Sequence, residues 1–492
     1  MRFVYNFPFF SIICMMVCAI ASPMLSGKKA LWLNRMGLAV TTAMNGTLLL
    51  DMIKNPTRIT FMMGHFPEPW GNEIRFGPLE ALLATVFSFI MLVIFVAGQE
   101  DVFKDIPKRN INLYFVMCDL LMTSLFALIY TNDLFTAYVF VEINTLTSLA
   151  IVMAKENGQT ITATIRYLVM SLLGSGLFLL SLTLIYDLTG HLLMPNIHSA
   201  LQILIADSSY RLPVTIIMGF LSVGLAMKSA LFPFHSWLSF AHGSATTPSS
   251  AILSSLVLKG YIILLVKIYF RVMGVETVQQ LKVSNVLFVF AILAMIIGSM
   301  DAIQQVHIKR MIAFSSVAQM GYIYAGIALG TELGYCAAFL QIIVHALTKS
   351  MLFCAAGGLA DSSDHKYTWG DLKGAAYRNP IAGAAFVIGS LSMIGIPFFA
   401  GFGSKFYLAM AAMTNPAKKW FMLFALAVST VLNAIYYTKA LVVIFSKDGD
   451  TAKRKQHLSY VLGMGVFIAA NVLLGLFYQQ FFNVISTGIK LF

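Results

Sequence analysis

The chain has 492 residues, of which 59% are hydrophobic and only 11% are charged, and its formal net charge is +12. A soluble protein of this length could not bury so much apolar surface, so the composition predicts a single membrane domain without a soluble head. The basic residues lie in short loops and form no cluster with interleaved aromatic residues, which excludes nucleic-acid binding. The five cysteines are too few and too scattered for a metal site.

Apolar segments long enough to cross a bilayer predict an all-α polytopic protein with about 14 membrane helices. The first segment lacks a small-residue cleavage site, so it is interpreted as a membrane helix and not as a signal peptide. The expected spans are 7–25, 33–53, 77–98, 111–130, 133–154, 163–187, 213–232, 250–270, 285–304, 311–330, 334–359, 381–411, 419–445 and 458–482.

Basic residues in the connecting loops predict the topology. About 17 of them follow odd-numbered helices and about 8 follow even-numbered helices. Because Lys and Arg concentrate in cytoplasmic loops, this asymmetry predicts that both termini lie on the extracytoplasmic side. The expected location of this multi-pass protein is a prokaryotic inner membrane.

Two of the predicted helices contain breaks. The seventh runs into Pro233, and the twelfth contains Pro397 in a glycine-rich stretch. Proline kinks a helix, and non-helical backbone at membrane depth survives only where protein buries it or water wets it. Since the breaks are five helices apart, two five-helix units of opposite orientation are expected, with plain proline kinks as the alternative. The predicted divisions are 1–110, 111–270 and 285–445 (the two repeats), and 458–492.

Six ionisable side chains lie within the apolar segments, where a charge at the centre of a helix costs about 2.5–3.5 kcal/mol on insertion scales. A chain that accepts this penalty repeatedly is expected to need the charges, so the pattern predicts a route for protons or cations. The six residues are Glu142, Lys228, Lys259, His345, Lys349 and Lys405.

Five local patterns carry a family resemblance. They are Asn132-Asp133-Leu134-Phe135 ahead of Glu142, the stretch from Lys228 to Leu238, that from Lys309 to Tyr322, that from His345 to Phe353, and that from Gly395 to Phe406. Over roughly residues 75–445 the chain resembles the antiporter-like subunits shared by respiratory complex I, membrane-bound hydrogenases and Mrp-type cation/proton antiporters.

Three positions depart from the common pattern of this family. Ser254-Ser255 stands where many members carry a His, Gln341 replaces a His found in some members, and Lys405 stands where one branch uses Glu. These choices resemble the branch that contains the quinone-proximal subunit of complex I and the Mrp D-type subunit.

The resemblance implies a role for each buried group, and each role has a structural alternative. Glu142 and Lys228 would form the input pair, or else a static ion pair. Lys259 would be the central relay, because apolar surroundings disfavour the charged form of a lysine, or else it would extend its ammonium to the membrane interface. His345 and Lys349 share one helical face and would pass a proton on, or else pack as core residues.

The resemblance also implies that Lys405 is the terminal group near the outer exit, with a structural lysine near a loop as the alternative. His235, Pro233 and Pro397 lie at the two breaks and would gate water there, or His235 would cap freed backbone groups. Lys267 lies near a helix end and is expected to extend its ammonium to the membrane surface. Asp301, Lys309 and Arg310 are expected to anchor the topology at a cytoplasmic helix end.

The predicted function is that of a proton-translocating, antiporter-like subunit driven by a redox partner module, such as a hydrogenase or a complex I relative. No cofactor is expected on this chain, so iron–sulfur, hydrogenase or quinone-site subunits would be its partners, together with other membrane subunits. One alternative is a subunit of a Mrp-type Na⁺/H⁺ antiporter. A second is a non-transporting membrane scaffold.

Overall fold

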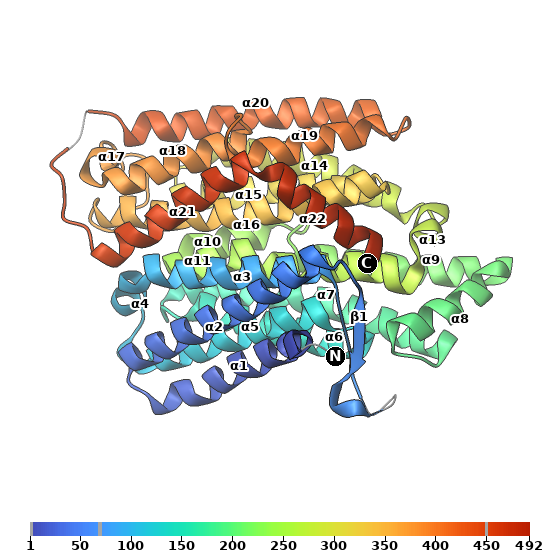
Figure 1. Cartoon of the computed structure of the whole chain (residues 1–492). Helices are drawn as coiled ribbons and strands as arrows, with labels where there is room; N and C mark the ends of the chain where they lie inside the picture. Colours follow the sequence, from blue (N-terminus) through green and yellow to red (C-terminus); the bar gives the residue numbers. More distant parts are fainter. Residues whose placement is uncertain (1–2, 67–70, 448–450) are drawn as a thin grey trace.

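Long apolar helices make up nearly all of the computed structural model, which describes residues 3–66, 71–447 and 451–492 (Figure 1). Hydropathy and length together predict such helices well, because a backbone in lipid has to satisfy its own hydrogen bonds. The helices are α1 (Phe7–Ala21), α2 (Gly27–Lys54), α3 (Pro78–Ala97), α4 (Gln99–Asp105), α5 (Ile111–Tyr130), α6 (Leu134–Met153), α7 (Gly158–Thr189), α8 (Met194–Ala206), α9 (Arg211–Lys228), α10 (Ser236–Ser244), α11 (Thr247–Ile252), α12 (Leu258–Ile268), α13 (Val275–Gln280), α14 (Val283–Gln304), α15 (Ile308–Ala328), α16 (Glu332–Asp361), α17 (Ala375–Arg378), α18 (Pro380–Ile394), α19 (Ala400–Met413), α20 (Lys419–Ile444), α21 (Leu458–Leu476) and α22 (Tyr478–Leu491).

Within the described residues, 13 helical segments are long and apolar enough to cross a membrane. The expected twelfth span is the one outside this set, because it is divided into the shorter helices α18 and α19. Counting this divided span, the structure confirms an all-α polytopic membrane protein with the expected number of crossings. The last expected span, 458–482, ends earlier than predicted, at Leu476, and the chain continues into the separate helix α22.

A small antiparallel hairpin was not expected from the sequence. Its strands are β1 (Ile59–Met62) and β2 (Glu73–Phe76), with Ile59 opposite Phe76. Four-residue strands are too short to give a clear alternating pattern, which explains why the sequence did not predict them. Figure 1 places the hairpin and both termini towards one end of the long helices, and α4 and α17 at the other end.

Both predicted breaks are present. The seventh span is divided into α9 and α10 around Pro233, and the twelfth into α18 and α19 around Pro397. Each break contains a non-glycine residue at positive φ, Ala230 at +56° and Phe398 at +74°. Such backbone persists only where its surroundings hold it. Ala230 is fully buried inside the bundle, whereas the Phe398 side chain is exposed on the outside of the second break. The division into inverted repeats stays a prediction.

The eighth and eleventh spans form the centre of the bundle. The central apolar stretches of Thr247–Met273 and Glu332–Asp361 are completely buried by the surrounding helices. The eighth span is also irregular, because π-helical turns at Leu253–Val257 and Tyr269–Met273 lie on either side of α12. Isolated π-turns in helices frequently mark functional positions, and one of these directly precedes Lys259.

Candidate functional site

The ion pair expected between the fifth and seventh spans is formed. Lys228 Nζ at the end of α9 lies 3.4 Å from Glu142 Oε1 on α6. Lys228 also donates to Thr145 Oγ1 at 2.8 Å, and Ser175 Oγ donates to Glu142 Oε1 at 2.6 Å. The Lys228 side chain is fully buried, whereas 26% of the Glu142 side chain is exposed. The pair therefore joins the outer surface of the bundle to its interior.

Lys259 lies at the start of α12 and is fully buried. Its ammonium donates a hydrogen bond to the carbonyl oxygen of Ser254, inside the preceding π-turn. The wider turn disturbs the regular hydrogen-bond ladder of the helix, which makes a backbone acceptor available to the side chain. A buried lysine thus obtains a polar partner without a carboxylate.

A chain of hydroxyl and carbonyl groups leads from Lys259 to Lys349. The Ser254 and Ser316 hydroxyls lie 2.9 Å apart, and Ser316 Oγ donates to the Ile312 carbonyl at 3.0 Å. Lys349 Nζ donates to the same carbonyl at 2.9 Å. Hydroxyls both donate and accept, so this arrangement can hold a proton-conducting chain between α12, α15 and α16.

A second polar chain leads from Lys349 to Lys405. Lys349 Nζ lies 3.5 Å from Tyr437 Oη, and the rings of Tyr437 and Tyr436 are 4.6 Å apart. Tyr436 Oη donates to Asn433 Oδ1 at 2.7 Å, and Asn433 Nδ2 donates to Tyr322 Oη at 3.4 Å. Lys405 Nζ in turn lies 5.0 Å from the Tyr322 ring centroid.

Lys405 also caps the twelfth-span break. Its ammonium donates to the carbonyls of Met393 and Ile394 at 2.9 and 2.8 Å. These oxygens belong to the last turn of α18, where carbonyl groups lack helical partners and favour a cation. The group predicted to be terminal therefore lies at the break itself.

His345 shares the α16 face with Lys349, as predicted from the spacing. It is fully buried, and neither ring nitrogen has a hydrogen-bond partner among the described residues. Lys259, Lys349 and His242 are all within electrostatic range of this imidazole. An unpartnered imidazole between two lysines is poorly explained by packing alone, because buried polar groups are normally paired.

His242 on α10 belongs to this site and was not singled out from the sequence. It is fully buried, both ring nitrogens lack partners among the described residues, and its ring stacks on Phe353 at 4.7 Å. It lies within electrostatic range of Lys259, Lys309 and Lys349. Its position on the short helix that follows the first break is the signal that could have identified it.

The tyrosine–asparagine chain of α20 was also missed. Ser429, Asn433 and Tyr437 recur every four residues in an apolar segment, which places them on one helical face. Ser429 and Asn433 both contact Ser299 on α14, at 3.1 and 3.3 Å between their oxygen atoms. A periodic polar stripe of this kind could have been detected from the sequence.

The three candidate gating residues lie at the breaks. His235 Nε2 is 3.5 Å from Asp301 Oδ2, and the ring packs against Phe232 with centroids 5.4 Å apart. Pro233 and Pro397 lie in the non-helical segments that separate the half-helices. Their role in gating stays a prediction.

One expectation about a lysine near a helix end was wrong. Lys267 does not reach the membrane surface: it is fully buried and donates to the carbonyls of Leu128 and Ile129 at 3.0 Å, and to that of Thr131. The free carbonyl groups at the end of α5 supply a nearer polar partner. Lys309 does lie at a helix end, in the first turn of α15, where it is buried and donates to the Ala245 carbonyl at 3.1 Å; its role as a topology anchor stays a prediction.

No group of three or more His, Cys, Asp or Glu side chains in the described parts of the chain could hold a metal ion. The expectation that the chain carries no cofactor stays an expectation. The groups at this site are proton-carrying side chains, and what they can do chemically is accept, hold and release protons or interact with a monovalent cation.

Residues 131–433 match the family described as "NADH:quinone oxidoreductase/Mrp antiporter, TM". The chain is 33% identical over 387 residues to the NADH-quinone oxidoreductase subunit N of Desulforudis audaxviator, covering 77% of this chain and 74% of the relative. It is also 27% identical over 419 residues to a protein of Staphylococcus epidermidis named as a putative antiporter subunit, mnhD2. This alignment covers 84% of this chain and 81% of the relative.

Two solved structures share the fold over the whole chain. A chain of the membrane-bound sulfane sulfur reductase, an archaeal respiratory membrane complex, superposes with a TM-score of 0.88 at 22% identity. A chain of the Mrp complex from Dietzia sp. gives the same TM-score at 20% identity, and each match covers 97% of the other chain. The segment that matches the family, residues 131–433, includes both helix breaks and all six predicted ionisable residues. The chain is therefore a multi-pass, antiporter-like membrane subunit that belongs to the NADH:quinone oxidoreductase/Mrp antiporter family.

Proposed function

We propose that this chain conducts protons between the two faces of the membrane, within a complex of several membrane subunits. The observation that carries the proposal is the series of polar contacts that joins Lys259, Lys349 and Lys405 through a bundle core that is otherwise apolar. A scaffold would gain stability by losing such charges, which argues against a purely structural role.

The Glu142–Lys228 pair would control loading of the path. With Glu142 ionised, Lys228 is held as an ammonium by the carboxylate and by the Thr145 hydroxyl. When Glu142 turns away or is protonated, the buried ammonium loses its counter-charge and gives up its proton more readily. A movement of one side chain at the edge of the bundle would therefore change the charge at its centre.

The proton would continue from Lys228 towards Lys259, and from there along the serine chain to Lys349. His345 and His242 lie beside this step, and either imidazole could hold a proton between the two lysines. Tyr437, Tyr436 and Tyr322 then lead towards Lys405 and the opened backbone at the second break, with Asn433 holding the hydroxyls of Tyr436 and Tyr322 through hydrogen bonds. The lysine, histidine and tyrosine side chains would carry the proton, and Asn433 would position hydroxyls or water along the route.

The basic loops support an orientation with the α4 end in the cytoplasm and both termini outside. Glu142, Lys228 and Lys259 lie on the fifth, seventh and eighth spans, within the first predicted repeat, and Lys349 and Lys405 lie on the eleventh and twelfth spans, within the second. Lys405, at the second break, would release protons towards the extracytoplasmic side.

The relatives suggest two alternative sources of energy for proton transport by this chain. The relatives named NADH-quinone oxidoreductase subunit N favour a redox partner module as the driving force, and quinone-site and iron–sulfur subunits are then the partners proposed for this chain. The antiporter subunit of S. epidermidis and the Mrp complex support the alternative, a Na⁺/H⁺ antiporter with other membrane subunits.

Purification of the complex from native membranes in mild detergent distinguishes these two sources of energy. Mass spectrometry identifies the subunits that accompany the chain, and the reconstituted complex is assayed for acidification driven by quinone chemistry or by a Na⁺ gradient. We expect quinone-dependent acidification with redox subunits present. Acidification that requires only a Na⁺ gradient would favour the antiporter instead. Lys349→Met should abolish transport in either case, and unchanged transport in that variant would refute the proposed path.

A further inference from the structure

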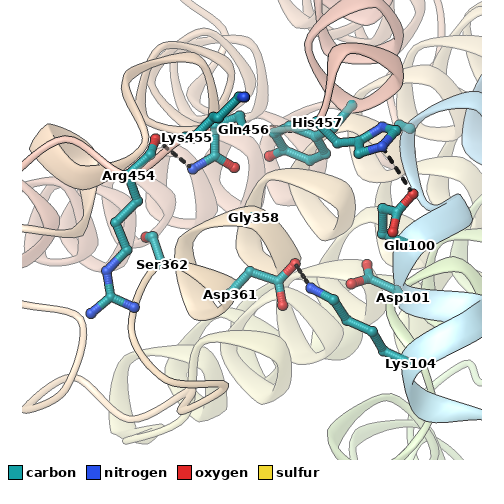
Figure 2. A pocket seen from close by; sticks show the side chains of 12 residues that line it. Glu100, Asp101, Lys104, Gly358, Asp361, Ser362, Arg454, Lys455, Gln456 and His457 are labelled. Atoms are coloured by element: carbon teal, nitrogen blue, oxygen red, sulfur yellow. Dashed lines mark hydrogen bonds and ion pairs between the residues drawn. The ribbon is translucent and has the colours of Figure 1, made fainter.

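A polar pocket opens at the α4 end of the bundle, opposite the termini (Figures 1 and 2). Its volume is about 260 Å³, and residues of α3, α4, α16 and the segment leading into α21 line it. Figure 2 shows the carboxylates of Glu100, Asp101 and Asp361 around one space, with Lys104 facing Asp361 and His457 facing Glu100. The corresponding nitrogen–oxygen distances are 3.8 and 3.6 Å. The pocket thus gathers titratable groups from three separate parts of the chain.

Lys309, at the start of α15, is a second buried group near this pocket. It is 1% exposed, and its ammonium lies 4.5 Å from the Tyr367 ring centroid. It donates to the carbonyl of Ala245, directly after α10, the helix that carries His242. Lys309 interacts electrostatically with both Asp101 and His242, so it is a candidate to connect the pocket with that histidine.

Two buried polar atoms on this connection have no hydrogen-bond partner among the described residues: the two ring nitrogens of His242. The Thr247 hydroxyl is also buried and interacts with the Asp101 carboxyl. Thr247 begins α11 and packs directly against α16, where a Cβ at Gly357 would lie only 2.5 Å from Thr247 Cγ2. Buried polar atoms without protein partners are the usual sites of internal water, which binds two to four such groups. A hydrated step between the pocket and His242 is therefore consistent with the side chains present.

We propose that this pocket is the mouth of the proton path on the α4 side, and that Asp101 passes protons through Lys309 to His242 and so to Lys259. In each cycle the Asp101 carboxyl would lose a proton to the Lys309 amine and regain one from water in the pocket. Lys309 would then release the same proton to the His242 imidazole. This inference rests on the proposed function and adds the inlet to it.

The charges around Asp101 support this assignment. Burial raises the pKa of the Asp101 carboxyl to about 7; the neighbouring Asp361 and Asp105 add to the rise, and Lys309 opposes it. A carboxyl that titrates near neutral pH can both accept and donate protons under cellular conditions. The charged or titratable groups around Asp101 and Lys309 are Glu100, Lys104, Asp105, Lys155, Asp361, Tyr367, Arg454, His457 and Tyr460.

The test measures transport by the intact complex in sealed vesicles as a function of pH on the α4 side. We expect Asp101→Asn to lower the rate at least about 100-fold, the lower end of the effect typical for loss of a proton-transfer group. The wild-type rate should fall as the pH rises through about 7, because Asp101 then loses the proton that it donates. Asp101→Glu should restore most of the rate. Glu156→Gln is the matched control, because Glu156 pairs with Arg109 outside the pocket.

A second variant keeps the inference testable if Asp101→Asn fails to assemble. Asp361→Asn removes a negative charge that raises the pKa of Asp101, so the midpoint of the pH profile should move to lower pH. An unmoved midpoint in an active complex would overturn the inference. Wild-type transport in Asp101→Asn, with transport abolished by Lys259→Met, would refute the inlet and leave the proposed function intact. Wild-type transport in Lys259→Met would refute the proposed function itself.

Discussion

The crossing of α7 and α9 gives a direct test of the geometry around the ion pair. Gly174 and Gly224 meet at this crossing, one turn before Lys228. A Cβ added at Gly174 would lie 2.8 Å from the Gly224 carbonyl oxygen and 3.1 Å from Lys228 Cγ. Ordinary contact begins near 3.4 Å, so the two helices would have to separate by about 0.6 Å. Forcing an extra methyl into a packed interior typically costs about 1–3 kcal/mol.

Gly174→Ala is expected to weaken the Glu142–Lys228 ion pair, because the distance between Lys228 Nζ and Glu142 Oε1 is already 3.4 Å and would increase when the helices separate. A cost of about 1–2 kcal/mol corresponds to a factor of about 5–30 in the population of the paired arrangement. We therefore expect the rate of proton transport by the assembled complex to fall by about that factor. Gly176→Ala on α7 and Gly219→Ala on α9 are matched controls, since nothing lies within 4 Å of a Cβ at either position. Full transport in Gly174→Ala, with the complex intact, would contradict this account of the crossing.

Three further changes test separate parts of the structure. Glu142→Gln leaves the buried ammonium of Lys228 without its carboxylate, so transport in vesicles should fall at least about tenfold; an unchanged rate would identify a static pair. Tyr437→Phe removes the hydroxyl between the eleventh and thirteenth spans, and transport should fall with little change in thermal stability; a loss of stability without a loss of rate would make that hydroxyl structural. Arg271→Leu strands the buried carboxylate of Glu80, whose side chain is 4% exposed, and should lower the free energy of unfolding by about 3–5 kcal/mol. The midpoint of thermal unfolding in detergent measures this loss, and an unshifted midpoint would contradict it.

The sequence predicted the helices and the breaks because both depend on local chemistry. A span needs about 20 apolar residues, and its backbone has no partner except itself, so hydropathy identifies it directly. Pro233 and Pro397 remove backbone donors wherever they stand, which is why both breaks could be located in advance. Ionisable groups such as Lys259 were equally visible, since a charge in an apolar segment is conspicuous.

The missed and mistaken residues depend on what other helices present to them. The polar stripe that contains Tyr437 is visible in the sequence, but its contact with Lys349 depends on another helix. His242 has no such local pattern, and its importance comes from its closeness to Lys259 and Lys349. Lys267 was expected at the surface because it lies near a helix end, yet the end of α5 brings free carbonyl groups to the same depth. Such tertiary neighbours are not encoded by spacing along one segment.

Proton translocation by the intact complex carrying Lys259→Met tests the central claim most directly. Methionine keeps the length and apolar stem of the side chain but cannot hold a proton, so the bundle should pack as before. Lys54→Met is the control, because Lys54 is an exposed lysine at the end of α2. The account predicts that the Lys259→Met complex is recovered with all its subunits and transports protons at least about tenfold more slowly than both the wild type and the control. Transport at the wild-type rate would contradict a path through the buried lysines.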